Sequence, residues 1–150
     1  MKKLRKSLIS LVLGELAAAL VFLIVYFNHF NFGMASLLAL IYLVFILLQG
    51  SAYWLFRALY LKREKLLSIR LMLHILRITN MLLACIVLVL MIILAQNKND
   101  IIVGILIFVF SIIEYVNYYW YRLSYGKSGF NLRLLFQSGL QPSSIHKLLK

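Results

Sequence analysis

Seven ionisable or amide side chains interrupt the long apolar runs of this sequence. They are Glu15, Gln49, His74, Arg77, Asn80, Glu114 and Asn117. Moving a charge into hydrocarbon costs on the order of a few kcal/mol, so such residues normally face the interior of a helix bundle. Carboxylates in that place can exchange protons or bind a cation, and amides can bridge helices through hydrogen bonds. These seven residues are therefore the candidate site, whether structural or functional.

The spacing of these residues predicts a shared polar layer. His74, Arg77 and Asn80 follow one another at intervals of three, which places them on one side of a helix. Glu114 and Asn117 have the same spacing. With a rise of about 1.5 Å per residue, the layer lies about 9–13 Å from the inner ends of its helices. Its members are Glu15, Gln49, Arg77, Asn80 and Glu114, and Arg57 and Arg122 form a rim on its cytoplasmic side.

The charges of this layer do not balance, because one arginine faces two acids. The simplest expectation is that Arg77 pairs with Glu114 or Glu15. The remaining carboxyl group is then protonated, paired with His74 or Arg57, or solvated by a pocket that opens to the cytoplasm. We expect such a pocket. Three roles stay open: a structural layer that fixes helix register, a site for an ion, proton or small ligand, and a docking surface for another membrane protein.

Patterns typical of catalysis are absent from the sequence. There is no H-E-x-x-H arrangement, no glycine-rich phosphate loop, and a single cysteine, Cys85, inside an apolar run. The sequence therefore predicts no metal, no cofactor and no enzymatic activity. His146, in the C-terminal tail, is expected to be solvated.

Four apolar runs must position the candidate residues: 8–27, 34–56, 71–95 and 101–121. Each can cross about 30 Å of hydrocarbon as a helix, the form in which such a segment bonds its own backbone groups. The apolar fraction of 64% exceeds the share of about 45–50% in soluble domains. The prediction is an all-α integral membrane four-helix bundle, made of two antiparallel transmembrane hairpins, in residues 1–123.

Three further expectations concern packing and the tail. Gly14 and Ala18 form a small-xxx-small face that predicts close helix approach by the first run. Tyr118 is expected in an aromatic belt at the inner interface. Residues 124–150 predict a basic cytoplasmic tail. The tail either forms a short amphipathic helix around 132–136 and a final helical turn at 145–149 opened by Pro142, or it is loosely ordered.

Lysine and arginine gather on one side of the predicted bundle. Of the 16 such residues, Lys98 is the one in the two outer connections and Arg77 the one inside a span. The positive-inside rule then places both termini and the middle loop in the cytoplasm of a plasma membrane. The net charge of +12 is expected to meet anionic lipid headgroups at the basic loops. Nucleic acid is not expected, because no soluble basic domain remains to bind it.

The segment 114–125, E-Y-V-N-Y-Y-W-Y-R-L-S-Y, carries a resemblance. It is similar to a segment of uncharacterised small four-span membrane proteins of Gram-positive bacteria, in which an E-Y-[IV]-N-Y-aromatic stretch closes the last span. With 143–149, the resemblance covers roughly a fifth of the chain. It implies a bacterial plasma-membrane protein and no particular activity. Glu15 also resembles the acidic residue in the first span of small multidrug exporters, whereas Glu114 and the basic tail do not fit them.

The expected function is that of a non-enzymatic accessory or interaction protein of the plasma membrane. Its partner would be another membrane protein or a second copy of the chain, as a homo-oligomer. The alternative is a small proton-coupled transporter or ligand-binding membrane protein that uses Glu15 and Glu114.

Overall fold

The computed structural model describes residues 2–29, 33–60, 69–122 and 141–149. The elements are the helices α1 (Lys2–His29), α2 (Met34–Leu59), α4 (Arg70–Leu94), α5 (Lys98–Tyr119) and α7 (Ser144–Leu149), and the two-residue strands β1 (Tyr121–Arg122) and β2 (Gln141–Pro142), which pair antiparallel. Four of the helices are long and apolar enough to cross a membrane. The predicted all-α four-helix bundle is therefore confirmed.

The helices extend past the apolar runs at several ends. Helix α1 begins at Lys2 and α5 begins at Lys98, because basic and polar residues continue a helix once it has formed. The predicted final turn is also present as α7, and Ser143 caps it by accepting a hydrogen bond from the His146 N–H at 3.0 Å. The amphipathic helix expected around 132–136 lies outside the described residues.

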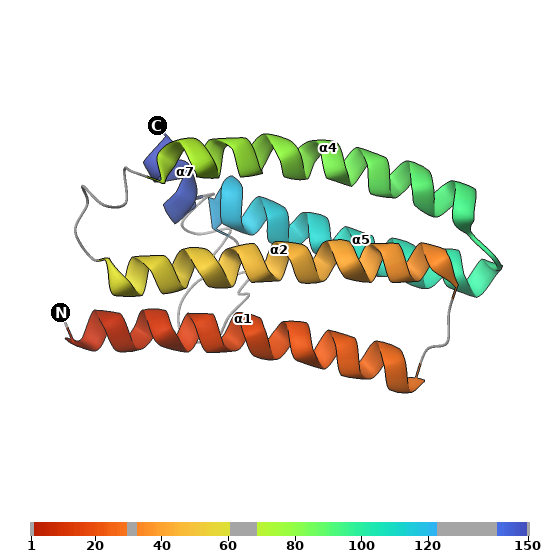
Figure 1. Ribbon diagram of the computed structural model, residues 1–150, viewed down its shortest axis with the longest axis horizontal. Helices are drawn as coiled ribbons and strands as arrows, with labels where there is room; N and C mark the ends of the chain where they lie inside the picture. Colours follow the sequence, from red (N-terminus) through yellow and green to blue (C-terminus); the bar gives the residue numbers. More distant parts are fainter. Residues whose placement is uncertain (1, 30–32, 61–68, 123–140, 150) are drawn as a thin grey trace.

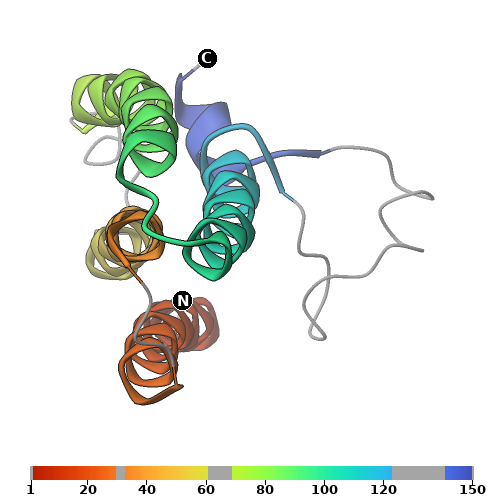
Figure 2. The ribbon, with the colours of Figure 1, turned by 90° about the vertical axis from the view of Figure 1, so that its right-hand side faces the viewer.

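Helix α2 is the centre of the bundle. It packs against α1, α4 and α5, and 56% of its most apolar stretch is buried, against 11–22% for the other three long helices. In the end-on view α1 and α4 lie on opposite sides of α2, and α5 lies beside it (Figure 2). Both ends of the chain lie at the same end of the bundle (Figure 1), here called the terminal end. The opposite end, with the α1–α2 and α4–α5 connections, is the loop end.

Small residues bring α2 and α5 together. A Cβ atom on Gly104 would lie 3.3 Å from the backbone carbon of Ala35. A Cβ atom on Gly50 would lie 2.5 Å from Cζ of Tyr118. The expectation that Gly14 makes such a contact is wrong, since a Cβ atom there would meet nothing within 4 Å. Ala18 and Ala19 of α1 pack instead on Leu43 and Leu47 of α2.

The Asp100 carboxylate ties the loop end together. Its Oδ1 accepts hydrogen bonds from the Ser36 N–H at 2.8 Å and the Ser36 hydroxyl at 2.6 Å, and its Oδ2 accepts from the Ala35 N–H at 3.2 Å. Gly33, at the N-cap of α2, has no side chain to do this. A carboxylate from α5 thus caps α2, and Asp100 is fully buried. Sequence reasoning placed Asp100 in an outer connection and gave it no role.

Replacing Asp100 by Ala should destabilise the bundle by about 2 kcal/mol or more, because it leaves the buried N–H groups of α2 without an acceptor. The measurement is reversible unfolding of the purified protein in mixed micelles. Asn99→Ala is the matched control, since Asn99 is exposed one residue away. Equal stability of the two variants would show that the Asp100 contacts contribute nothing.

Candidate functional site

The predicted polar layer divides into two separate groups in the structure. Gln49 of α2 and Asn80 of α4 meet each other, and Arg77 contacts Trp120 instead of joining them. Glu15 lies with Glu114 and Asn117 on the other side of α5, toward α1. The common depth expected from the sequence therefore does not produce one connected site.

The first group is an amide cluster formed by Gln49, Asn80 and Tyr119. Gln49 Nε2 donates to Asn80 Oδ1 at 3.1 Å, and Asn80 Nδ2 donates back to Gln49 Oε1 at 2.6 Å. The Tyr119 hydroxyl donates to the same Gln49 Oε1 at 2.8 Å. Asn80 is fully buried. Two reciprocal amide bonds between helices fix the register of α2 against α4, which is a structural role.

Backbone carbonyls of α4 are bonded by two further tyrosines. The Tyr42 hydroxyl donates to the Asn80 carbonyl at 3.1 Å, and the Tyr115 hydroxyl donates to the Arg77 carbonyl at 3.0 Å. These bonds come from α2 and α5 respectively, so α4 is held to both neighbours at one level. These two hydrogen bonds therefore fix the position of α4 against α2 and α5.

Arg77 does not pair with an acid in the described part of the chain. Its guanidinium carbon lies 3.6 Å from the centroid of the Trp120 ring, a cation–π contact. The expected ion pair with Glu114 or Glu15 is therefore replaced by an aromatic contact. His74 is exposed on α4 and takes no part in either group.

The second group is an acid cluster formed by Glu15, Glu114, Asn117 and Tyr118. The Tyr118 hydroxyl donates to Glu15 Oε2, and Glu114 also interacts with this hydroxyl. Asn117 Nδ2 donates to Glu114 Oε2 at 3.2 Å. Gly50 leaves room for the Tyr118 ring, so Tyr118 points into the bundle and not into the expected interfacial belt. Tyr118 is the link between α1 and α5 that the sequence did not reveal.

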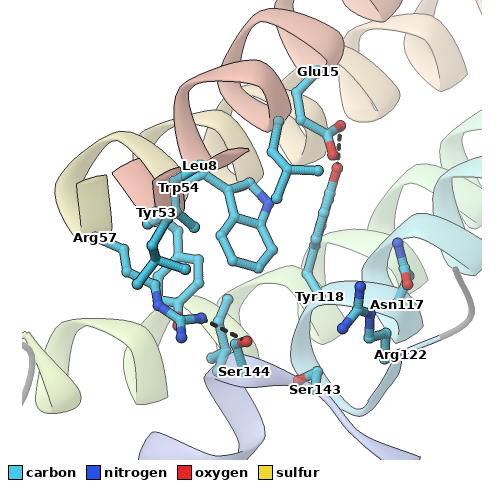
Figure 3. A pocket seen from close by; sticks show the side chains of 13 residues that line it. Leu8, Glu15, Tyr53, Trp54, Arg57, Asn117, Tyr118, Arg122, Ser143 and Ser144 are labelled. Atoms are coloured by element: carbon cyan, nitrogen blue, oxygen red, sulfur yellow. Dashed lines mark hydrogen bonds between the residues drawn. The ribbon is translucent and has the colours of Figure 1, made fainter. Parts of the chain in front are cut away.

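A pocket of about 240 Å³ lies beside the acid cluster at the terminal end. Figure 3 shows Glu15 and Tyr118 meeting at one side of it and Arg57 and Ser144 at the other. Its walls come from α1, α2, the end of α5, β1 and α7, through Leu4, Leu8, Leu11, Glu15, Tyr53, Trp54, Arg57, Asn117, Tyr118, Arg122, Ser143, Ser144 and Ile145.

The pocket contains four of the nine residues singled out from the sequence. Glu15, Asn117, Arg57 and Arg122 line it, whereas Glu114 does not. A pocket next to an acidic residue was expected, and one is present. Its leucine wall was missed, although Leu4, Leu8, Leu11 and Glu15 recur at helical spacing on one face of α1.

Helix α7 closes one side of this pocket. Arg57 Nη1 donates to the Ser144 hydroxyl at 2.8 Å, and the Ser143 N–H donates to the Trp120 carbonyl at 3.0 Å. Ile145 is buried against the bundle. His146 was expected to be solvated, but its Nδ1 is buried and has no hydrogen-bond partner in the described residues. The end of the tail is thus part of the site.

Comparison with known proteins assigns neither a family nor a function to this chain. The chain matches no protein-family model, no curated protein and no solved structure. Within the described residues, no group of three or more His, Cys, Asp or Glu side chains could hold a metal ion. The arrangement of the pocket and of the two polar clusters is what carries a functional argument.

The amide cluster predicts energetic coupling between Gln49 and Asn80. Replacing either residue by Leu should destabilise the bundle, because the remaining amide is buried without its partner. The double variant should cost less than the sum, with a coupling energy of about 0.6–1.7 kcal/mol, the range for interhelical hydrogen bonds in membranes. Reversible unfolding of the four proteins measures this value. Thr79→Leu, at an exposed site on α4, is the control, and additive effects would contradict the structural role.

Proposed function

We propose that this chain is a non-enzymatic accessory or interaction protein of a bacterial plasma membrane, and that it binds its ligand or partner at the terminal-end pocket. The observation that carries the proposal is the division of the polar residues. The side chains of the amide cluster form hydrogen bonds with one another between helices. The pocket is the place where polar side chains from several elements face a space large enough for part of another molecule.

The distribution of charge supports a cytoplasmic position for the terminal end. Basic residues of α1, α2, α4 and α7 lie there, among them Arg5, Arg57, Arg70 and Lys147, whereas the loop end has Lys98. The positive-inside rule then puts the pocket and both chain ends on the cytoplasmic side. Partners would reach the site from the cytoplasm or from the inner leaflet.

A proton-coupled transporter is the second candidate. Glu15, Tyr118 and Glu114 form a chain of titratable groups between α1 and α5, and Glu15 reaches the pocket. Transport also needs a path to the opposite side. Among the described residues, the loop end contains the buried Asp100 hydrogen bonds and the packed side chains of Ala35, Ala39 and Met91. This packing favours a binding role.

Blocking the pocket should abolish binding. Leu11→Trp fills the pocket from α1, whereas Leu13→Trp makes the same change at an exposed position of the same helix outside the pocket. Tagged proteins are purified from native membranes, and bound proteins and small molecules are identified. We expect a molecule that is recovered with wild type and Leu13→Trp and lost with Leu11→Trp. Equal recovery from both variants, or no bound molecule at all, would contradict the proposal.

Variants of Glu15 and Glu114 distinguish an accessory protein from a transporter. In an accessory protein, Glu15→Gln and Glu114→Gln should lower the amount of folded protein, because each amide places N–H donors where the carboxyl oxygens now accept from Tyr118 and Asn117. The loss of such a hydrogen bond costs roughly 0.5–1.5 kcal/mol. In a transporter, both variants would stay abundant and lose solute uptake. Size-exclusion profiles of solubilised membranes and uptake assays in cells give the two readings.

A further inference from the structure

We propose that the terminal-end pocket binds an anionic phospholipid of the inner leaflet, with the phosphate at the arginine rim and the first part of an acyl chain against the leucines of α1. This inference rests on the proposed function, in which the same pocket is the binding place, and it names the class of ligand.

The lining of the pocket carries a net positive charge. Two guanidinium groups, Arg57 and Arg122, line the pocket with one carboxyl group, Glu15, and that carboxyl accepts a hydrogen bond from Tyr118. The net charge of the lining is positive whether or not Glu15 is ionised. Arginine binds phosphate through a planar set of five N–H donors, so the bonds of Arg57 with Ser144 and Tyr53 leave further N–H groups for a ligand.

An apolar wall borders the same pocket. Leu4, Leu8 and Leu11 follow one another along a single face of α1, and the Trp54 ring faces the same space. Leu4 and Leu11 are 53% and 42% exposed although they border a charged pocket. A small soluble anion would leave these apolar side chains without a contact. A ligand with an anionic head and a hydrocarbon chain contacts both parts.

The arginines of the pocket lie at the ends of the spanning helices. Arg57 stands two residues before the end of α2 at Leu59, and Arg122 follows the end of α5 at Tyr119. The ends of spanning helices lie at the level of the lipid headgroups. The leucine wall runs from that level inward along α1 toward Glu15. Basic pockets between spanning helices on the cytoplasmic side are a known mode of binding anionic headgroups.

The test uses the full chain in a neutral detergent and native mass spectrometry. The probes are phosphatidylglycerol and phosphatidylcholine with identical acyl chains. We expect retention of phosphatidylglycerol at least about tenfold above phosphatidylcholine. Arg57→Gln and Arg122→Gln should each lower it about tenfold, the loss expected for one charge-assisted contact. Arg5→Gln, which makes the same change at an exposed residue outside the pocket, should leave it unchanged.

Three additional variants guard against misfolding and non-specific charge effects. Arg57→Lys keeps the charge and loses the planar donor set, so it should fall between wild type and Arg57→Gln. Leu11→Trp should release the lipid, and Leu13→Trp should not. Size-exclusion profiles establish that each variant is folded before its binding is compared.

Several results would overturn the lipid assignment. They are equal retention of both lipids, an equal loss in Arg5→Gln and Arg57→Gln, and displacement of the lipid by inorganic phosphate at similar concentration. Binding of tetraphenylphosphonium that is lost in Glu15→Gln and unchanged in Arg57→Gln would identify a site for organic cations. If Leu11→Trp still loses a membrane-derived partner while the lipids show no preference, the proposed function stands and the lipid assignment fails.

Discussion

The close contact between α2 and α5 is the constraint on which the rest of the structure depends. At the loop end, Asp100 of α5 accepts hydrogen bonds from the first turn of α2. Nearby, Gly104 of α5 lets the two backbones approach each other closely. At the terminal end Gly50 lets the Tyr118 ring lie against α2. Lipid offers no hydrophobic force to bring helices together, so small residues and hydrogen bonds have to supply the attraction. Helices α1 and α4 then pack on the pair that this contact creates.

The two ends of the bundle use polar groups in different ways. At the loop end the Asp100 carboxylate is buried and satisfied by donors of α2 and by the Gln96 N–H at 3.3 Å. At the terminal end the Glu15 carboxyl accepts from a tyrosine and borders a pocket. At the loop end both carboxylate oxygens of Asp100 accept hydrogen bonds, so this buried group needs no further partner. An open end with arginine, serine and leucine in its walls can exchange contacts with a second molecule.

Composition and periodicity predicted the helices but not how the polar residues pair. The lengths of the apolar runs predict four spans because one quantity, the thickness of hydrocarbon, decides them. The partner of Arg77 depends on which way its helix is turned, and the stacking on Trp120 requires coordinates of both α4 and the end of α5. The common depth correctly predicted the contact of Gln49 with Asn80. Glu15 meets Tyr118 and Glu114 but not the amide cluster, because that cluster lies at a similar depth on a different side of α5.

The residues missed by sequence reasoning share a physical reason. Asp100 sits in a short polar connection, where an acidic residue is ordinary, and its role appears when the N-terminus of α2 is found to lack a cap of its own. Tyr118 lies in a run of aromatic residues that looks interfacial, and the space left by Gly50, far away in sequence, turns it inward. Ser143 and Ser144, at the start of α7, belong to the tail, yet their bonds with Trp120 and Arg57 hold that helix against the bundle. Each role is set by a long-range contact, and the pocket exists because three such contacts, from α1, α2 and α7, converge at the end of α5.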